Sequence, residues 1–276
     1  MLSFVLFLFA ARVETLTLTS KVFGNTRSIR VLLPPDYEQT HRAYPVLYLN
    51  DGLMVFRERA IDIGSIPLLP PIIVVGIDNG ASTDTSSKDR DDRAMEYLPY
   101  PDAGFPPAHT YAPDPANPRG KSYPRFLIDE VMPLIEGKYR VLRGPSNTAI
   151  GGFSYGGVAA LYTVIAEPGI FGKLLLESTP LWIGENRQLL QDAGRLKAWP
   201  ASVYIGVGTA EAPDEAINAE GRKDIDSLLA IINRNSHETR VKYVIEPHAT
   251  HGPAAWRRRL PAALQFLFGP TSPRQP

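Results

Sequence analysis

The sequence predicts an α/β fold with a mostly parallel central sheet and helices on both of its faces. Two short apolar runs, "YPVLYLNDG" over Tyr44–Gly52 and "PIIVVGIDNG" over Pro71–Gly80, have the continuous hydrophobicity of strands buried on both faces, which is typical of parallel sheets. Between 126 and 139, apolar residues recur at helical spacing. Strand-like and helix-like segments then alternate toward the end of the chain, and this alternation indicates an α/β fold.

The other elements follow from the same patterns. Residues 13–20 alternate between polar and apolar side chains, and a second strand begins at Ser28; we expect this pair to lie at one edge of the sheet and to be antiparallel. Pro133 lies inside the 126–139 helix and predicts a kink there. Further strands are expected at 148–153, 172–179, 201–209 and 239–247, and further helices at 158–166, 217–234 and 254–268.

Composition limits the class of protein. The chain has 276 residues, of which 44% are hydrophobic, and 29 basic residues balance 29 acidic ones. The zero net charge argues against the basic surface of a nucleic-acid-binding protein. The absence of cysteine excludes disulfides, cysteine-ligated zinc and thiol nucleophiles. Length and composition fit one α/β domain, which we place at residues 12–270.

Residues 1–11 form a short apolar run, "MLSFVLFLFAA". The run is too short to cross a bilayer as a helix, so no stable membrane span is expected. Its length suits the apolar region of a signal peptide, but the basic residues that normally precede such a region are missing. A periplasmic or secreted location and a cytoplasmic one are therefore equally open, and the sequence does not predict the oligomeric state.

One segment, at about 78–123, is too long for an ordinary connection between elements. It is rich in proline and contains five aromatic residues, Tyr97, Tyr100, Phe105, Tyr111 and Tyr123. Disordered segments are usually poor in aromatic side chains. We therefore expect an ordered cap over the functional site, with aromatic side chains that suit an aromatic or bulky substrate group.

The stretch "GGFSYGG" joins a predicted strand to a predicted helix and places Ser154 at the junction, in the pattern G-x-S-x-G. A nucleophilic serine on such a turn adopts strained backbone dihedrals, and side chains two residues away would clash, which Gly152 and Gly156 avoid. Gly157 allows the helix to pack close to the sheet. The alternative is a glycine-rich turn with a helix-capping serine. The strand-turn-helix context favours the nucleophile.

A serine nucleophile needs a base, and the base needs a carboxylate that orients it. In this arrangement the chain order is serine, acid, histidine. His251 lies in the loop just before the last helix and is the preferred base, with His248 as the alternative. Glu211 comes first after the 201–209 strand and is the preferred acid, with Asp214 as the alternative.

Backbone N–H groups must stabilise the oxyanion that forms during acyl transfer. The N–H of Tyr155, the residue after the nucleophile, is the first candidate. The second is the N–H of Leu53, in the loop after the 44–52 strand, where Gly52 permits a close approach. The acidic side chain of Asp51 in that loop is expected to serve the structure instead of the oxyanion.

Taken together, these motifs resemble the esterase D and enterochelin esterase-like family of α/β-hydrolases over roughly residues 25–268. The resemblance is carried by "SIRVLLPPDY", "YPVLYLNDG", "FLIDEVMPLIEGKYRV", "AIGGFSYGG", "GTAE" and "HGPAAWRRRLPAALQFLF". It implies an α/β-hydrolase fold with Ser154, Glu211 and His251 as the catalytic triad, because the histidine of the family is followed five residues later by a tryptophan, here Trp256. The sequence "NDG" and the lack of cysteine disfavour the S-formylglutathione hydrolases and favour the enterochelin-esterase-like branch.

Within that branch, "DDRAMEYLP" resembles an R-x-x-E-x-x-P segment, here Arg93, Glu96 and Pro99. The resemblance makes Arg93 and Glu96 candidate substrate-binding residues. Asp51 and Trp256 complete that candidate set.

The sequence therefore predicts a serine carboxylic-ester hydrolase that acts through an acyl-enzyme on a small-molecule ester. The expected acyl group is aromatic or bulky, of the siderophore-, feruloyl- or acetyl-ester type, and no metal or cofactor is required. The alternatives are an acyltransferase with the same triad and a non-catalytic binding module on the same fold. The basic run at 257–259 is expected on the solvated face of the last helix.

Overall fold

A computed structural model describes residues 12–52, 56, 66–80, 93–102 and 117–270 of the chain. The strands are β1 (Arg12–Thr19), β2 (Thr26–Leu33), β3 (Val46–Asn50), β4 (Ile73–Ile77), β5 (Thr148–Phe153), β6 (Lys173–Glu177), β7 (Ser202–Ala210) and β8 (Arg240–Thr250). The α-helices are α3 (Tyr123–Arg125), α4 (Met132–Lys138), α5 (Tyr155–Ala166), α6 (Gln188–Arg195), α7 (Glu215–Asn235) and α8 (Pro253–Phe268). Short 3-10 turns lie at η1 (Tyr37–Gln39), η3 (Gly120–Ser122) and η5 (Pro145–Asn147), and η4 (Phe126–Val131) is π-helical.

The strands form one sheet in the order β1-β2-β4-β3-β5-β6-β7-β8. β1 pairs antiparallel with β2, and β2 pairs antiparallel with β4, whereas the remaining neighbours are parallel. The predicted mostly parallel sheet with an antiparallel edge is therefore confirmed. In such sheets the carboxyl ends of the parallel strands meet along one edge, where α/β folds bind their ligands.

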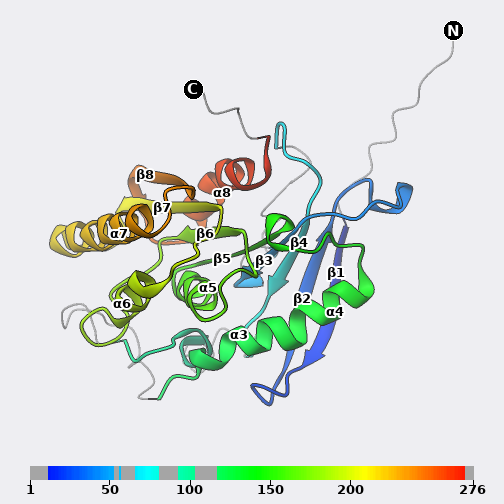
Figure 1. The fold of residues 1–276 in the computed structure, drawn as a ribbon, viewed down its shortest axis with the longest axis horizontal. Helices are drawn as coiled ribbons and strands as arrows, with labels where there is room; N and C mark the ends of the chain where they lie inside the picture. The colour runs from blue at the N-terminus through cyan, green and yellow to red at the C-terminus, as the bar shows by residue number, and fades with distance from the viewer. Residues whose placement is uncertain (1–11, 53–55, 57–65, 81–92, 103–116, 271–276) are drawn as a thin grey trace, which may run out of the picture.

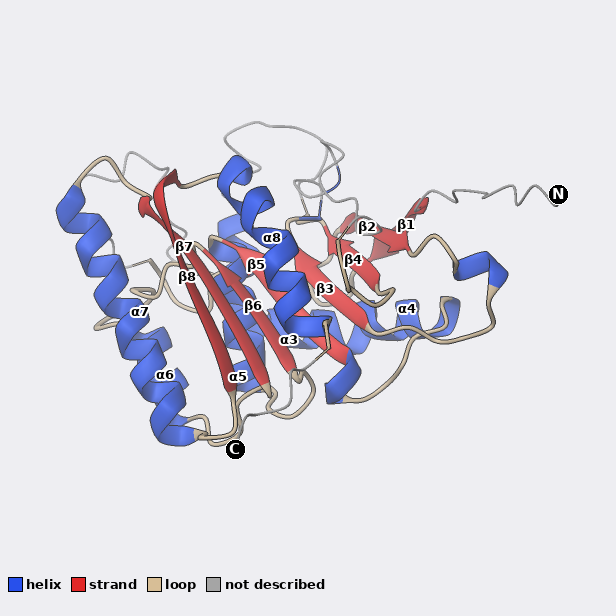
Figure 2. Cartoon of the chain, turned by 90° about the horizontal axis from the view of Figure 1, so that it is seen from above, coloured by secondary structure: helices blue, strands red, loops and turns tan. Residues whose placement is uncertain are grey.

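Helices cover both faces of the sheet, as Figure 1 and the view from above in Figure 2 show. On one face, α5 and the helices around it form a large core with the inner strands, to which α5, α6 and α7 contribute Val158, Leu161, Leu189, Leu190, Leu228 and Ile232. On the other face, α8 packs on the centre of the sheet through an apolar stripe made by Trp256, Leu260, Leu264 and Leu267. No helix in the described ranges is long and apolar enough to cross a membrane.

The predicted 126–139 helix begins earlier than expected, with the short α-helix α3 at Tyr123, and the segment between α3 and α4 is π-helical. The π-helical segment Phe126–Val131 ends just before Pro133. Proline lacks a backbone N–H, and its ring clashes with the carbonyl four residues earlier. A π-helical turn loosens the hydrogen-bond ladder at that point and so accommodates Pro133. The kink expected at Pro133 stays a prediction.

The 78–123 segment is described at 78–80, 93–102 and 117–123, and two of its aromatic residues belong to the core. Tyr97 and Tyr123 are fully buried, with ring centroids 5.4 Å apart in an edge-on contact. The expectation that these two rings face a substrate is therefore wrong, because burying both of them in the core removes a large apolar area from water. The cap itself stays a prediction. Phe105 and Tyr111 lie outside the described residues, as do residues 1–11.

Candidate active site

Ser154 occupies the turn between β5 and α5, with φ 53° and ψ −127°. A non-glycine residue adopts these dihedrals only where the surrounding structure imposes them. Its side chain makes no capping hydrogen bond to α5, so the alternative of a helix-capping serine is not supported. A Cβ atom on Gly152 would lie 2.2 Å from the carbonyl carbon of Gly156. The turn therefore needs glycine there, as the G-x-S-x-G spacing predicts.

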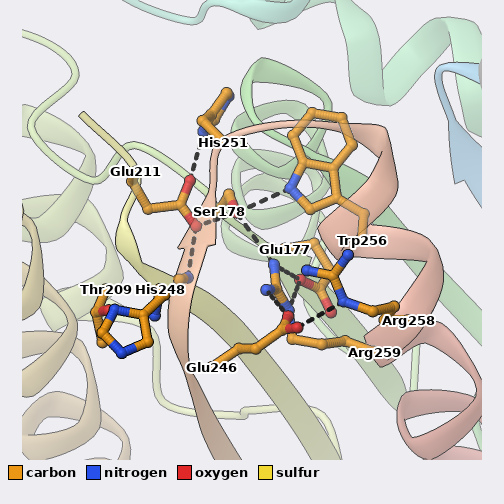
Figure 3. A network of polar contacts seen from close by, with 11 residues as sticks. Glu177, Ser178, Thr209, Glu211, Glu246, His248, His251, Trp256, Arg258 and Arg259 are labelled. Carbon is orange, nitrogen blue, oxygen red and sulfur yellow. Dashed lines mark hydrogen bonds and ion pairs between the residues drawn. The ribbon is translucent and has the colours of Figure 1, made fainter. Parts of the chain in front are cut away.

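Glu211 and His251 follow the ends of the neighbouring strands β7 and β8 and face each other. Oε2 of Glu211 lies 2.7 Å from Nδ1 of His251 (Figure 3). The backbone N–H of Gly208 donates to Oε1 of Glu211 at 2.5 Å, next to a register shift in the β7–β8 ladder. With Nδ1 held by the carboxylate, Nε2 of His251 is the atom that can accept a proton from a serine hydroxyl.

The environment of Glu211 keeps this carboxyl group ionised. Burial alone would raise the pKa of Glu211, but the hydrogen bond and charge of His251 lower it, as do the N–H of Gly208 and the hydroxyl of Ser178. The net effect places the pKa of Glu211 below its ordinary value. A charged carboxylate at this position orients an imidazole and stabilises its protonated form.

The two alternatives for acid and base have other contacts. Asp214 caps α7 by accepting a hydrogen bond from the N–H of Ala216 at 2.8 Å. His248 donates its backbone N–H to Oγ1 of Thr209 at 2.7 Å. The geometry therefore favours the preferred residues, Glu211 and His251, over these two.

Trp256 links the serine turn to the base. Its ring stacks on Phe153, the residue before Ser154, at 5.1 Å and meets the imidazole of His251 edge-on at 5.2 Å. The side chain is buried, and its Nε1 donates to Oγ of Ser178 at 2.8 Å. The expected substrate contact of Trp256 is therefore wrong, because its ring and its N–H are both engaged within the protein.

The predicted oxyanion loop follows β3. Leu53 lies outside the described residues, so its N–H stays a predicted donor, as does that of Tyr155. The start of the loop is fixed by Nδ2 of Asn50, which donates to the carbonyl of Gly156 at 2.7 Å. The hydroxyl of Tyr123 donates to Oδ1 of Asn50, and the N–H of Asp51 donates to the hydroxyl of Tyr97. Both buried tyrosines therefore stabilise the start of this loop.

Asp51 and Arg93 form an ion pair. The guanidinium donates from Nε to Oδ1 and from Nη2 to Oδ2, both at 2.7 Å, and Nη2 also donates to the carbonyl of Phe153 at 3.2 Å. Asp51 therefore serves the structure, as expected for its acidic side chain, and the expectation that it contacts the substrate is wrong because Arg93 binds both of its oxygens. Arg93 lies at the site edge, where its contact with substrate remains a prediction.

Glu96 is not placed to bind a substrate. Its carboxylate is buried and accepts two hydrogen bonds from Arg27 at 2.8 Å and one from Asn25 at 2.7 Å. The expectation drawn from the R-x-x-E-x-x-P segment is wrong here, because a buried carboxylate must be paired and this one is paired inside the core.

Two functional candidates escaped sequence reasoning. Oγ of Ser178 donates to Oε1 of Glu211 at 2.7 Å, and Arg259 is buried beside Glu177 with a closest approach of 2.7 Å. The expectation that the whole 257–259 run is solvated is wrong for Arg259, because it lies three residues after Trp256 and shares the buried side of α8. A polar residue directly after a parallel strand was the available signal for Ser178.

Tyr155, the residue after Ser154, shares a carboxylate partner with a second aromatic side chain, Trp182. The hydroxyl of Tyr155 and Nε1 of Trp182 donate to the two carboxylate oxygens of Asp102, at 2.8 and 3.1 Å. Both rings are half-buried. Within the described part of the chain, no group of three or more His, Cys, Asp or Glu side chains is arranged to hold a metal ion.

The chain is similar to several known proteins. Among curated proteins, the chain is 25% identical over 251 residues to "Uncharacterized protein YbbA" of Bacillus subtilis (strain 168), which covers 89% of this chain and 94% of that protein. It is 26% identical over 155 residues to the iron(III) enterobactin esterase of Dickeya dadantii (strain 3937), which covers 53% of this chain and 35% of that protein. The chain thus matches about a third of the latter protein.

Solved structures share the fold at low sequence identity. The siderophore hydrolase EstB from Aspergillus nidulans superposes with a TM-score of 0.72 at 19% identity, covering 95% of this chain and 96% of that one. The enterobactin esterase FES from Shigella flexneri gives 0.69 at 20% identity, covering 93% and 58%. A ferulic acid esterase gives 0.67 at 18% identity, covering 94% and 98%. These likenesses establish the α/β-hydrolase fold.

The sequence profile of one family covers most of the chain. It is described as "Putative esterase" and matches residues 20–267, which include Ser154, Glu211 and His251. The chain therefore belongs to this esterase family of enterochelin-esterase-like α/β-hydrolases.

Proposed function

We propose that the protein is a serine carboxylic-ester hydrolase with Ser154, Glu211 and His251 as its catalytic triad. Two observations carry the proposal. Ser154 has a strained backbone and does not cap α5, and it lies at the carboxyl end of a parallel strand. At the carboxyl ends of the neighbouring strands β7 and β8, Glu211 and His251 lie 2.7 Å apart. Membership of an esterase family supports the reaction class.

The first half of the reaction forms an acyl-enzyme. Oγ of Ser154 attacks the ester carbonyl while Nε2 of His251 takes the hydroxyl proton, and Glu211 stabilises the imidazolium. The N–H groups of Tyr155 and Leu53 are the proposed oxyanion donors, each worth roughly 3 kcal/mol in related chemistry. When the tetrahedral intermediate collapses, the ester C–O bond breaks and the imidazolium gives its proton to the leaving alcohol.

The second half restores the serine. Water attacks the acyl carbonyl while Nε2 of His251 takes a proton from it, and a second tetrahedral intermediate forms at the same donors. Its collapse breaks the bond to Oγ, which recovers the proton from His251. The products are the free acid and the unmodified enzyme, so each turnover consumes one ester and one water.

We propose an aromatic or bulky acyl group as the preferred substrate feature. Tyr155 follows Ser154 in the sequence, and Asp102 joins its hydroxyl to the indole of Trp182; both rings are partly exposed. Aromatic rings at a site contribute a large apolar contact area to a ring of the substrate. The names of the structural neighbours, a siderophore hydrolase, an enterobactin esterase and a ferulic acid esterase, support the same class.

The test is labelling with a fluorophosphonate probe, read by intact-protein mass spectrometry, on the wild type and on Ser154→Ala. We expect a single adduct and hydrolysis of p-nitrophenyl acetate in the wild type, and neither in the variant. Thermal unfolding of both proteins controls for loss of the fold. A wild type without adduct and without hydrolysis would contradict the proposal and favour a non-catalytic binding module.

The acyl preference is tested with two esters that share a leaving group, methyl ferulate and methyl acetate. We expect a higher kcat/KM for methyl ferulate. The opposite preference would overturn the aromatic-acyl part of the proposal and leave the hydrolase part standing.

A further inference from the structure

Ser178 stands at the same strand edge as the triad, in a strained conformation. It follows the last residue of β6 and has φ 47°, which is unusual for a non-glycine residue. Its backbone N–H donates to the carbonyl of Gly206 at 2.8 Å, and the residue is buried. Residues in strained conformations persist only where the surrounding structure holds them, and they cluster at functional sites.

Three neighbours determine the direction of the Ser178 hydroxyl. Nε1 of Trp256 lies 2.8 Å from Oγ, and Nη2 of Arg259 lies 3.3 Å from it (Figure 3). Indole and guanidinium groups only donate hydrogen bonds, so both use the lone pairs of Oγ. The hydroxyl proton is then left for Oε1 of Glu211, at 2.7 Å.

This arrangement divides the two oxygens of Glu211 between two tasks. Oε1 accepts from the Ser178 hydroxyl and from the N–H of Gly208, whereas Oε2 faces Nδ1 of His251. A carboxylate held on one oxygen by two donors cannot rotate without breaking both bonds. Its other oxygen is therefore aimed at the imidazole before any substrate arrives.

Trp256 and Arg259 come from one side of α8, the helix that begins two residues after His251. Arg259 is itself fixed by two carboxylates, with Nε 2.8 Å from Glu177 and Nη1 2.8 Å from Glu246. The indole of Trp256 also meets the His251 ring edge-on. One helix thus sets both the ring plane of the base and, through Ser178, the rotamer of the acid.

We propose that Ser178 and Trp256 are positioning residues of the triad, in which the indole N–H directs the Ser178 hydroxyl onto Glu211. The inference rests on the proposed function, because the triad it positions is the one proposed above. It assigns to Ser178 and Trp256 a role in holding the base and not in binding the substrate.

The test uses two variants that remove one bond each. Trp256→Phe keeps an aromatic ring and removes the indole N–H, and Ser178→Gly removes the hydroxyl while tolerating φ 47°. We expect kcat to fall roughly 10- to 100-fold in both, because small misplacements of catalytic groups cost that much. KM is expected to stay unchanged, since neither side chain touches the substrate.

Trp199→Phe is the matched control. Trp199 is also buried, but it belongs to the core on the opposite face of the sheet, and its Nε1 has no hydrogen-bond partner among the described residues. This variant makes the same chemical change away from the site and is expected to keep the wild-type kcat.

A second readout is independent of hydrolysis. The Nδ1 proton of His251, hydrogen-bonded to Glu211, should give a downfield proton NMR resonance that shifts or broadens in Trp256→Phe and Ser178→Gly but not in Trp199→Phe. Wild-type kcat and an unchanged resonance in both site variants would overturn the inference. A wild type that shows the resonance but forms no fluorophosphonate adduct would instead contradict the proposed function, so the two failures are distinguishable.

Discussion

The loop after β7 offers two carboxylates within four residues, and their hydrogen bonds assign different roles to them. Glu211 faces His251, whereas Asp214 caps α7. We expect Glu211→Gln to lower kcat by roughly 10³- to 10⁴-fold, because an amide no longer stabilises the imidazolium or fixes its tautomer. Steady-state hydrolysis of p-nitrophenyl acetate measures the effect.

Asp214→Asn is the control for that prediction. Asparagine caps helices about as well as aspartate, so the free energy of unfolding should change by only a few tenths of a kcal/mol. The kcat of this variant is expected to match the wild type. An equal loss of kcat in both variants would return Asp214 to the list of candidate acids.

Individual residues were predictable where a motif fixed them and not where only packing does. The turn at Ser154 could be predicted because glycine spacing is a local property of the chain. For Ser178 the sequence offered only its place after a strand, and for Arg259 it offered nothing, because three consecutive arginines look alike and the contacts depend on which side of α8 faces the end of β6. Glu96 failed for the same reason, because its partner Arg27 lies on a strand 69 residues earlier.

At the scale of elements, the guanidinium group of Arg93 connects the loop after β3 to the end of β5. Arg93 donates to both oxygens of Asp51 in the loop after β3 and to the carbonyl of Phe153 at the end of β5. Lysine cannot reproduce this three-way contact, because its ammonium is a point charge without a planar fork. We expect Arg93→Lys to lower kcat roughly tenfold or more by loosening the oxyanion loop.

Arg187→Lys is the matched control for Arg93→Lys. Arg187 also binds two carboxylate groups, those of Asp224 and Glu220, but it joins α6 to α7 away from the site. This variant should lose stability in urea denaturation and keep the wild-type kcat. If both lysine variants lost stability while neither lost activity, the contact of Arg93 would be purely structural.

The elements themselves were predicted well where burial sets the pattern. The inner strands β3, β4 and β5 are continuous apolar runs because both of their faces are covered. The helix α6 was missed because eight residues give little more than two turns of periodicity. The ends of the 78–123 segment were misjudged, since aromatic residues in a proline-rich stretch do not reveal whether they face a ligand or the core.

Across the whole molecule, several strained residues lie at the carboxyl ends of the sheet strands. Asp51, Ser154 and Ser178 have positive φ and follow the ends of β3, β5 and β6, and His248 near the end of β8 shares the property. Each such conformation costs on the order of 1–3 kcal/mol, which the packing of the two large cores must offset. These strained residues lie beside the proposed triad, and this is the pattern expected of a site assembled by the fold.

The sheet also buries a carboxyl group near these strand ends, that of Glu177. Glu177 ends β6 with no exposed surface and pairs with Arg259. Burial raises the pKa of Glu177 from 4.5 to about 7, even though the hydrogen bond and charge of Arg259 oppose the shift. Between these values the folded protein binds this proton more tightly than the unfolded chain does. The stability that Glu177 contributes is therefore complete at low pH and is lost as the pH rises through 7.

Glu177→Gln removes this dependence because glutamine does not titrate. We expect the free energy of unfolding of the variant, relative to the wild type, to increase from pH 5 to pH 8 by up to about 3 kcal/mol, measured by urea denaturation. Glu246→Gln is the control: the pKa of Glu246 is lowered, so its contribution changes only at more acidic pH, and the difference should stay constant over the same range. A Glu177→Gln difference that is equal at both pH values would mean that Arg259 keeps Glu177 ionised throughout, and the buried edge would then behave as a permanent ion pair.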